Sequence, residues 1–232
     1  MNLAHLVFVV MPSASPVIEL SIVRFYIVYI YKNYAPLSLF FIFSLKMNLL
    51  KYLESIITVS EPLREKIISV SEQTFIKKGQ SILNVGERCS DLYFIDKGLL
   101  RGFYFSEEKE ITNWFGQEGE FAICFYSFIS QKPSFETIHA LEDSELTQIP
   151  YAALQSLYNN FPETERIGRI LTETYYIRLE ERLLNIQFKS AKERYQNLLE
   201  SKSSLLKRAP LGQISSYLGI TQETLSRMRA ER

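Results

Sequence analysis

The sequence is poor in the residues that build metal centres and disulfide frameworks. Its 232 residues include two cysteines, Cys89 and Cys124, and two histidines, His5 and His139. Two cysteines so far apart make neither a disulfide framework nor a CxxC metal site, and an iron–sulfur cluster normally takes four thiolates. His139 stands in an alternating stretch that is typical of a strand. We therefore expect no metal, no haem and no other cofactor.

The chain also lacks an unbroken apolar run of the length that a membrane span takes, about 20 residues. Residues 1–46 are rich in aromatics but contain a series of prolines and charges: Pro12, Pro16, Glu19, Arg24, Lys32 and Pro36. The first basic residue, Arg24, comes too late for a secretory signal. Two interpretations stay open. We favour an apolar leader upstream of a true translation start at Met47, and the alternative is a membrane anchor.

Charge of one sign is not in excess over the whole chain, which carries 26 Lys+Arg and 26 Asp+Glu. A net charge of zero by itself argues against a nucleic-acid partner. The distribution is uneven, however, because residues 47–177 carry 12 Lys+Arg against 19 Asp+Glu, whereas residues 178–232 carry 11 against 6. An acidic front followed by a basic tail predicts that the tail lies near a polyanion.

Residues 71–150 have the pattern of short strands separated by glycines. Apolar residues alternate in several stretches, among them DLYFIDKG, LLRGFYF and FETIHALEDSELTQI. Many short strands with closely spaced turn signals predict a β-sandwich or barrel. After Pro150 the apolar period becomes helical, with a long helix expected from about Glu163 to Lys189. Its apolar stripe predicts packing either on its own domain or against a second copy of the same helix.

The segment LGQISSYLGITQETLSRMR, residues 211–229, fits a helix-turn-helix. Gly219 permits the tight turn between two helices, and the small Ser215 permits their close approach. Apolar residues that face the core occur at the matching positions on both helices: Ile214, Leu218, Leu225 and Met228. A helical hairpin that only completes a domain is the alternative to a DNA-binding motif.

The second helix of this motif carries a polar face. Thr221 is expected to cap the helix, because its hydroxyl can accept a hydrogen bond from an unpaired backbone N–H group of the first turn. A helical spacing of about 100° per residue places four polar residues on the side opposite Leu225: Gln222, Glu223, Ser226 and Arg227. Their amide, carboxylate, hydroxyl and guanidinium groups suit the edges of bases. A solvated helix surface has a similar composition.

Several long stretches together resemble one family. KKGQSILNVGERCSDLYFIDKGLLRGFY resembles a cyclic-nucleotide-binding jelly roll, and GEFAICFYSFISQKPSFETIHALEDSELTQI resembles its phosphate cassette and the strands that follow. RYQNLL and YLGITQETLSRMR resemble the DNA-binding domain of the same proteins. Residues 47–232 as a whole are similar to the Crp-Fnr family of transcription regulators, particularly to the short members common in Bacteroidetes.

The resemblance implies an α+β protein with a cyclic-nucleotide-binding-like sensor jelly roll over residues 47–160. It further implies a dimerisation helix over 161–189 and a helix-turn-helix domain over 190–232 with a reduced or absent wing. We expect a cytoplasmic homodimer that binds double-stranded DNA at a palindromic operator with half-sites about 10 bp apart. RNA polymerase and a small-molecule effector of unknown identity are further expected partners. The resemblance assigns DNA contacts to Thr221, Gln222, Glu223, Ser226 and Arg227, with Ser215 as a phosphate contact.

The phosphate cassette departs from the family pattern. Members that bind cyclic AMP carry an Arg followed by Ser or Thr, where this chain has Ser134 and Phe135, with Glu136 next. Because no positive side chain is available there, we predict a sensor that does not bind cyclic AMP. Glu120 keeps the position that contacts the ribose. The candidate pocket residues are Glu120, Phe121, Ser134 and Phe135, and the aromatics of this segment either fill the pocket as core or line it for an apolar ligand.

Two other classes of function were weighed against a regulator. A ligand-binding or scaffold module would have the sensor fold without a DNA output, and the basic tail argues against it. An enzyme on a jelly roll would need clustered histidine and carboxylate ligands, and only His139 remains after Met47. We therefore expect a DNA-binding regulator without catalytic activity.

Overall fold

The computed structural model describes residues 48–107 and 109–230. The interpretations of residues 1–46 concern a segment outside these ranges. Residues 48–56 form a helix, which precedes α3 (Glu61–Val70). Pro62 stands in the first turn of α3, where a missing N–H donor costs no helical hydrogen bond. Among the described residues, no helix combines the length and the apolar character that a membrane crossing takes.

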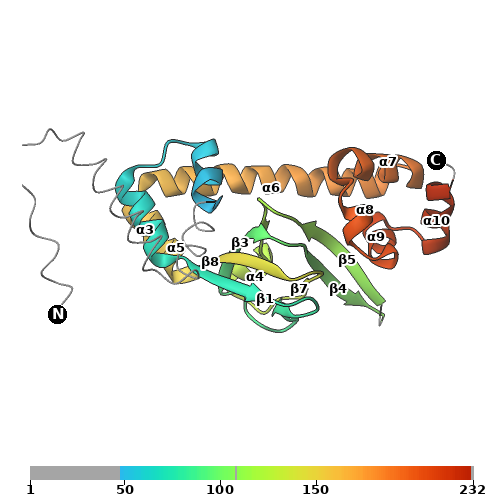
Figure 1. The fold of residues 1–232 in the computed structure, drawn as a ribbon, viewed down its shortest axis with the longest axis horizontal. Helices are drawn as coiled ribbons and strands as arrows, with labels where there is room; N and C mark the ends of the chain where they lie inside the picture. Colours follow the sequence, from blue (N-terminus) through green and yellow to red (C-terminus); the bar gives the residue numbers. More distant parts are fainter. Residues whose placement is uncertain (1–47, 108, 231–232) are drawn as a thin grey trace, which may run out of the picture. The chain divides into compact units, whose positions relative to one another are not determined.

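Two four-stranded antiparallel sheets form the central β-sandwich (Figure 1). The strand order is β1-β8-β3-β6 in one sheet and β2-β7-β4-β5 in the other. The strands are β1 (Glu72–Ile76), β2 (Ser81–Leu83), β3 (Asp91–Lys97), β4 (Leu100–Ser106), β5 (Lys109–Gly116), β6 (Phe121–Ala122), β7 (Thr137–Ala140) and β8 (Ser144–Pro150). The apolar residues alternate along these strands, so every second side chain points into the space between the sheets, and the two sheets pack face to face. The predicted β-sandwich is confirmed.

The core of the sandwich is aliphatic in the middle. Its fully buried members include Ile95, Leu100, Ile138 and Leu146. Gly102 in β4 lies directly beneath the indole of Trp114 in β5, so that any side chain at position 102 would clash with that ring. The interior between the sheets is therefore filled by the chain's own side chains.

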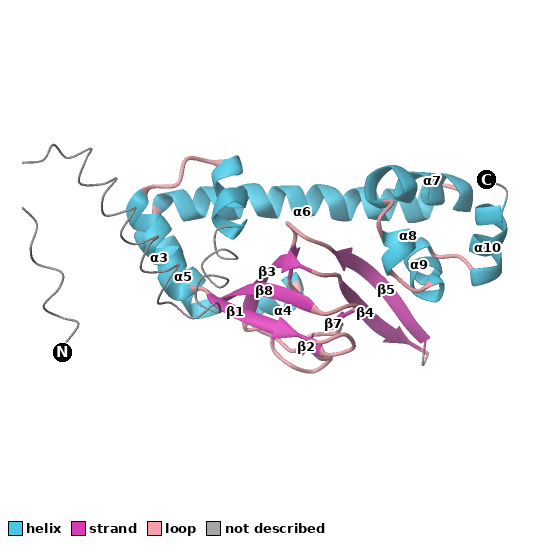
Figure 2. Cartoon of the chain, viewed as in Figure 1, coloured by secondary structure: helices cyan, strands magenta, loops and turns pink. Residues whose placement is uncertain are grey.

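Along the sequence, helices precede the first strand of the sandwich and follow the last one (Figure 2). α4 (Phe125–Ser130) stands between β6 and β7, and every regular element of the described chain after β8 is a helix. These helices are α5 (Tyr151–Asn160), α6 (Pro162–Phe188), α7 (Ala191–Lys202), α8 (Leu205–Arg208), α9 (Leu211–Leu218) and α10 (Gln222–Ala230). The mixed α+β class is confirmed, with a long helix between the sandwich and the C-terminal helices.

A helix stop and a new helix start separate α6 from the C-terminal helices. α6 ends at Phe188, and Ser190 begins α7 with a capping box in which its hydroxyl accepts from the Glu193 N–H while Glu193 accepts from the Ser190 N–H. The C-terminal helices then share one apolar core with the sandwich. That core joins Leu99, Phe115 and Leu141 of the sandwich to Ile214, Leu218 and Leu225.

Candidate nucleic-acid interface and sensor cavities

α9 and α10 form the predicted helix pair. Gly219 adopts a left-handed backbone conformation (φ 64°) that ends α9, and the following N–H of Ile220 donates to the Ser215 carbonyl at 3.0 Å. Ile214 and Leu225 are fully buried between the helices, and Met228 packs against the same core. The sequence pattern that suggested the motif thus corresponds to its packing.

The polar face of α10 points into solvent. Its four candidate reading residues are all exposed: Gln222, Glu223, Ser226 and Arg227. Thr221 is exposed as well, and its hydroxyl accepts from the Thr224 N–H at 3.2 Å, as expected of a cap. Hydrogen bonds from the first-turn backbone and from Thr221, together with the charge of Arg227, lower the pKa of Glu223. The face therefore presents an ionised carboxylate beside a guanidinium at neutral pH.

Ser215 lies apart from this face. Its side chain is buried, with 3% of the residue exposed, and its hydroxyl donates to the Gly212 carbonyl at 2.9 Å. The small residue serves the close packing of the motif, and its hydroxyl is already engaged. A phosphate contact from Ser215 would need a rearrangement of α9, so we do not carry it into the proposed interface.

Two arginines from outside the motif hold the C-terminal end of α9. Arg182 of α6 donates to the Tyr217 carbonyl at 3.3 Å and lies over the Tyr217 ring, with 4.2 Å between its guanidinium carbon and the ring centroid. Arg194 of α7 donates to the Leu218 carbonyl at 2.8 Å. Cations at this position satisfy the unpaired carbonyls of the last turn and complement the negative end of the helix dipole. The orientation of the motif is thus set by α6 and α7.

Ser134 and Phe135, which stand where the family pattern has Arg and Ser or Thr, both make contacts within the protein. Ser134 is buried, and its hydroxyl donates to the Glu136 carbonyl at 2.8 Å and accepts from the Glu136 N–H at 3.1 Å. Phe135 is instead half exposed and packs against Tyr126 on the outside. Ser134 and Phe135 therefore do not line the cavities described below, contrary to the expectation for a pocket.

Glu136 directly precedes β7 and is turned toward β5. It is buried, and its carboxylate accepts from the Trp114 indole N–H at 3.3 Å and from the Asn113 amide at 3.2 Å. Burial raises the pKa of Glu136, although these hydrogen bonds oppose the shift. A buried carboxyl group at this point offers no favourable partner to a phosphate.

Glu120 lies where the β-sandwich meets α6 and α7. Its carboxylate accepts from Lys202 Nζ of α7 at 2.7 and 2.9 Å, and Arg178 Nη1 of α6 lies at 3.4 Å. Glu120 also accepts from the Gln117 N–H at 3.1 Å, which fixes the turn before β6. The position that contacts the ribose in the family is therefore bound by cations of the chain itself.

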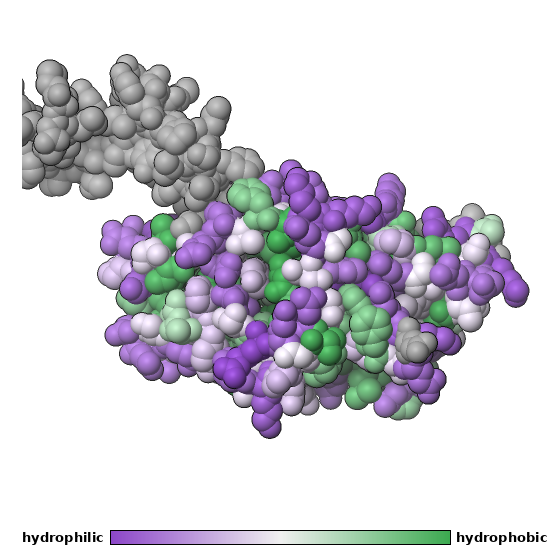
Figure 3. Space-filling model, turned by 90° about the horizontal axis from the view of Figure 1, so that it is seen from below, coloured by the Kyte–Doolittle hydropathy of each residue, from purple (hydrophilic) through white to green (hydrophobic). Residues whose placement is uncertain are grey.

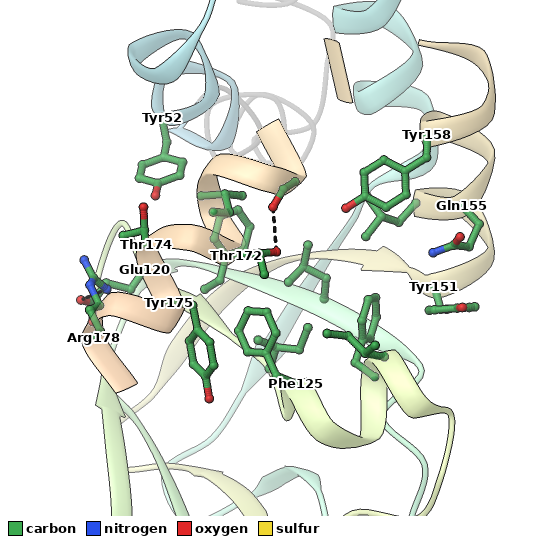
Figure 4. A pocket seen from close by; sticks show the side chains of 18 of the residues that line it. Tyr52, Glu120, Phe125, Tyr151, Gln155, Tyr158, Thr172, Thr174, Tyr175 and Arg178 are labelled. Atoms are coloured by element: carbon green, nitrogen blue, oxygen red, sulfur yellow. Dashed lines mark hydrogen bonds and ion pairs between the residues drawn. The ribbon is translucent and has the colours of Figure 1, made fainter. Parts of the chain in front are cut away.

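Two cavities adjoin Glu120. The first, which we call the cassette cavity, measures about 320 Å³ and lies between α4, α5 and α6. Figure 4 shows Glu120 and Arg178 together on one side of it, with Tyr151, Gln155 and Tyr158 on the other and Phe125 and Tyr175 between them. The stacked rings of Phe125 and Tyr175, with centroids 3.8 Å apart, separate its two ends.

The second, which we call the interdomain cavity, measures about 490 Å³ and lies between β5, α6 and α7. Of the four candidate pocket residues, Glu120 and Phe121 line both cavities. No local sequence pattern points to Lys202, which is 82 residues away from Glu120 and belongs to another domain. Arg178 was likewise missed, because it reads as one charge among many on a long helix. Among the described residues, no cluster of three or more His, Cys, Asp or Glu side chains is arranged to hold a metal ion.

Comparisons with known proteins agree with this architecture. Residues 73–161 match the family model of the cyclic nucleotide-binding domain. The fumarate and nitrate reduction regulatory protein of Vibrio cholerae is 28% identical over 166 residues, which cover 66% of this chain and 65% of that protein. The chain thus spans slightly less than two thirds of this relative.

Solved structures show the same fold. FixK2 from Bradyrhizobium japonicum superposes with a TM-score of 0.62 at 20% identity, covering 70% of this chain and 84% of that one. A protein from Eubacterium rectale, described as a transcriptional regulator of the crp/fnr family, gives 0.59 at 24% identity, with 73% and 82% covered. At these identities the likeness establishes the arrangement of sandwich, long helix and C-terminal helices.

Proposed function

We propose that this chain is a Crp-Fnr-type transcription regulator, a sequence-specific DNA-binding protein that acts as a homodimer, as its similarity to such regulators and its fold support. The observation that carries the proposal is the exposed polar face of α10, which stands on a rigid, fully packed helix pair. Arg227 is placed to bind guanine O6 and N7, Glu223 to accept from cytosine N4, and Gln222 to reach an adenine. Ser226 and Thr221 complete the proposed interface.

The homodimer is supported by an exposed apolar row along α6. Only Thr164 and Ile167 of this helix are buried, whereas a series of large apolar side chains toward its C-terminal end is about half exposed or more: Tyr176, Ile177, Leu183, Leu184 and Phe188. Leu179 and Ile186 are similarly exposed but line the interdomain cavity. Such a row is costly in water and is stabilised by pairing with an identical helix. The face drawn in Figure 3, by contrast, mixes hydrophilic and hydrophobic residues.

A two-fold axis along α6 would give one copy of α10 to each half of a palindrome, with half-sites about 10 bp apart or a multiple of that spacing. RNA polymerase completes the proposed set of partners, as the machinery on which a regulator acts. We propose no catalytic role. We also propose that the cassette does not hold a cyclic phosphate at Ser134, because that serine is buried and its hydroxyl is already bonded.

Replacement of Arg227 tests the DNA contact. We expect Arg227→Ala to weaken binding to the operator recovered by footprinting by about 1–3 kcal/mol and to relax selectivity at one base position. The measurement is a gel shift with the operator and with single-base variants of it. Arg169→Ala, which removes an exposed α6 arginine paired with Glu173, serves as the matched control and should bind like the parent. Equal affinity and selectivity for Arg227→Ala would refute the assignment.

Charges placed in the apolar row test the dimer. We expect Ile177→Glu combined with Leu184→Glu to shift the monomer–dimer equilibrium toward monomer by more than about 1.4 kcal/mol, which is tenfold in the dissociation constant. Analytical ultracentrifugation measures this directly. Val85→Glu, at another half-exposed apolar residue, is the control and should leave the equilibrium unchanged. A doubly substituted protein that remains dimeric would move the interface away from α6.

A further inference from the structure

The interdomain cavity is lined by both functional halves of the chain. β5 contributes Trp114 and Phe115, α6 contributes Arg178 and Arg182, and α7 contributes the end of its last turn at Lys202. Neither Ser134 nor Glu136 of the cassette takes part in the lining. At about 490 Å³ the cavity falls in the size range of small-molecule sites. Glu120 and Phe121, at the start of the cassette, also border it, so the cavity lies between that end of the cassette and the C-terminal helices.

Positive charge exceeds negative charge around this cavity. The ionisable residues that line it are Glu120, Arg178, Glu181, Arg182, Arg194 and Lys202, four cations and two carboxylates. Arg182 and Arg194 donate to backbone carbonyls at the end of α9. Arg178 and Lys202 both turn to the one carboxylate of Glu120, and Arg178 meets it only at the long distance of 3.4 Å. A second anion at this point would meet two cations that now share one partner.

The other groups that line the cavity are largely aromatic or apolar. Trp114, Phe115, Phe121, Phe125 and Tyr175 all border it. In the view of the neighbouring cassette cavity, Glu120 and Arg178 lie together and the Tyr175 ring lies next to Phe125 (Figure 4). Aromatic walls next to paired cations suit a ligand that has a flat or apolar body and one acidic group.

We infer that the interdomain cavity binds a small organic anion, a carboxylate or a phosphate monoester, whose acidic group is held by Arg178 and Lys202 and whose apolar body packs on the aromatic wall. The bound anion competes with Glu120 for these two cations. Because Lys202 also donates to the Phe115 carbonyl at 3.1 Å, the ligand contacts the bond that joins α7 to β5. The site does not depend on the proposed DNA contacts of α10.

The protein carries its own reporter for this site, because Trp114 is the single tryptophan of the sequence and lines the cavity. We expect titration of the full chain with phenyl phosphate and with benzoate to change the Trp114 fluorescence in a saturable way. Benzyl alcohol tests the apolar body without the charge, and inorganic phosphate tests the charge without the body. Both should bind about tenfold more weakly than the combined probe. Equal responses to phenyl phosphate and benzyl alcohol would overturn the proposal.

Substitutions on the two sides of the ion pair should act with opposite signs. We expect Lys202→Met to weaken phenyl phosphate binding by about tenfold, and Arg178→Met to do the same. Glu120→Gln removes the competing carboxylate, so it should strengthen binding severalfold. Lys192→Met, an exposed lysine on the same helix outside the cavity lining, is the matched control and should bind like the parent. Weaker binding in Glu120→Gln would overturn the proposed competition, since a role in folding alone gives loss in every variant.

The outcome is separable from the test of DNA binding. Fluorescence titration is done without DNA, and the gel shift with Arg227→Ala is done without an organic anion. A protein that binds its operator but shows no saturable response of Trp114 to either acidic probe would refute the ligand site and leave the regulator intact. A saturable response of Trp114 to an acidic probe in a protein that binds no operator would refute the regulator and leave the ligand site intact.

Discussion

The cassette buries its polar side chains, whereas α10 exposes its polar side chains to solvent. In the cassette, Ser134 and Glu136 are each 3% exposed, and both have hydrogen-bond partners within the sandwich. On α10, Glu223 and Arg227 are exposed, and Glu223 is held by hydrogen bonds from the start of its own helix and by the charge of Arg227. Both segments carry residues that the sequence predicts to be contacts, the cassette for a small molecule and α10 for DNA.

The difference indicates which residues act for the fold and which act for a partner. A buried polar group must be satisfied inside the protein, because leaving it unpaired costs about 1–3 kcal/mol. Ser134 and Glu136 meet that condition without any ligand, so their identities are explained by packing. Exposed polar groups on a helix gain only about 0.2–0.5 kcal/mol per pair from their arrangement, so a matched set of them is better explained by a surface that they recognise. Three predictions test this division, in order of decreasing effect.

The largest effect is expected beneath the reading helix. Leu225→Ala deletes a fully buried side chain from the core shared by α9, α10 and the sandwich, so the free energy of unfolding should fall by about 2–5 kcal/mol. Urea unfolding followed by circular dichroism measures the change. Ser226→Ala, the next residue on the exposed face, should stay within about 0.5 kcal/mol of the parent. If Ser226→Ala were as costly as Leu225→Ala, the exposed face would be part of the fold after all.

The second prediction concerns a half-buried carboxyl group in the sandwich. Burial raises the pKa of Asp96 to about 6 from its ordinary 3.8, and the hydrogen bond from the Thr147 hydroxyl at 2.7 Å opposes the shift only in part. The folded state then holds the proton more tightly than the unfolded state between pH 4 and 6. The free energy of unfolding should therefore decrease as pH rises through this window, by about 1–3 kcal/mol. Asp96→Asn should remove this slope.

The control for Asp96 is a carboxylate of the opposite kind. Asp143 accepts from Lys77 Nζ at 2.7 Å and from the Lys78 N–H at 3.0 Å, and these bonds lower its pKa. Its contribution is present above the ordinary pKa and is lost as pH falls, so Asp143→Asn should affect only the acid limb, below about pH 4. Denaturation curves for the two variants across pH separate the cases. A parent slope between pH 4 and 6 that persists in Asp96→Asn would exclude Asp96 as its source.

The sequence alone predicted a good part of this architecture and less of the chemistry. The alternation of apolar residues predicted the strands of the sandwich, and the apolar spacing around Gly219 predicted the helix pair. Both predictions succeeded because these patterns reflect the local geometry of strands and helices. The departure from the family pattern at Ser134 and Phe135 could be read from the sequence, but Ser134 is buried and Phe135 faces outward. A sequence without coordinates cannot distinguish them. The bond from Lys202 to Glu120 depends on the docking of one domain on another, which no local pattern encodes.

The smallest effect is expected where the two regions are joined. Arg208 of α8 donates to Glu118 at 2.7 Å and also binds Glu142, so it joins the C-terminal helices to the sandwich. Because these groups are partly exposed, Arg208→Met should lower the free energy of unfolding by only about 1 kcal/mol. Burial raises the pKa of Glu118, but the hydrogen bonds from Arg208 and from the Gly98 N–H outweigh it and hold the pKa at about 2.

The acid dependence makes the Arg208 prediction specific. A depressed pKa means that the stabilisation by Glu118 is present above the ordinary pKa of 4.5 and is lost as pH falls toward 2. Arg208→Met should abolish most of that loss, whereas Lys207→Met, its exposed neighbour on α8, should keep the parental profile. Thermal unfolding between pH 2 and 5 distinguishes the two. An Arg208→Met protein with an unchanged acid profile would show that the C-terminal helices are held on the sandwich by the shared apolar core alone.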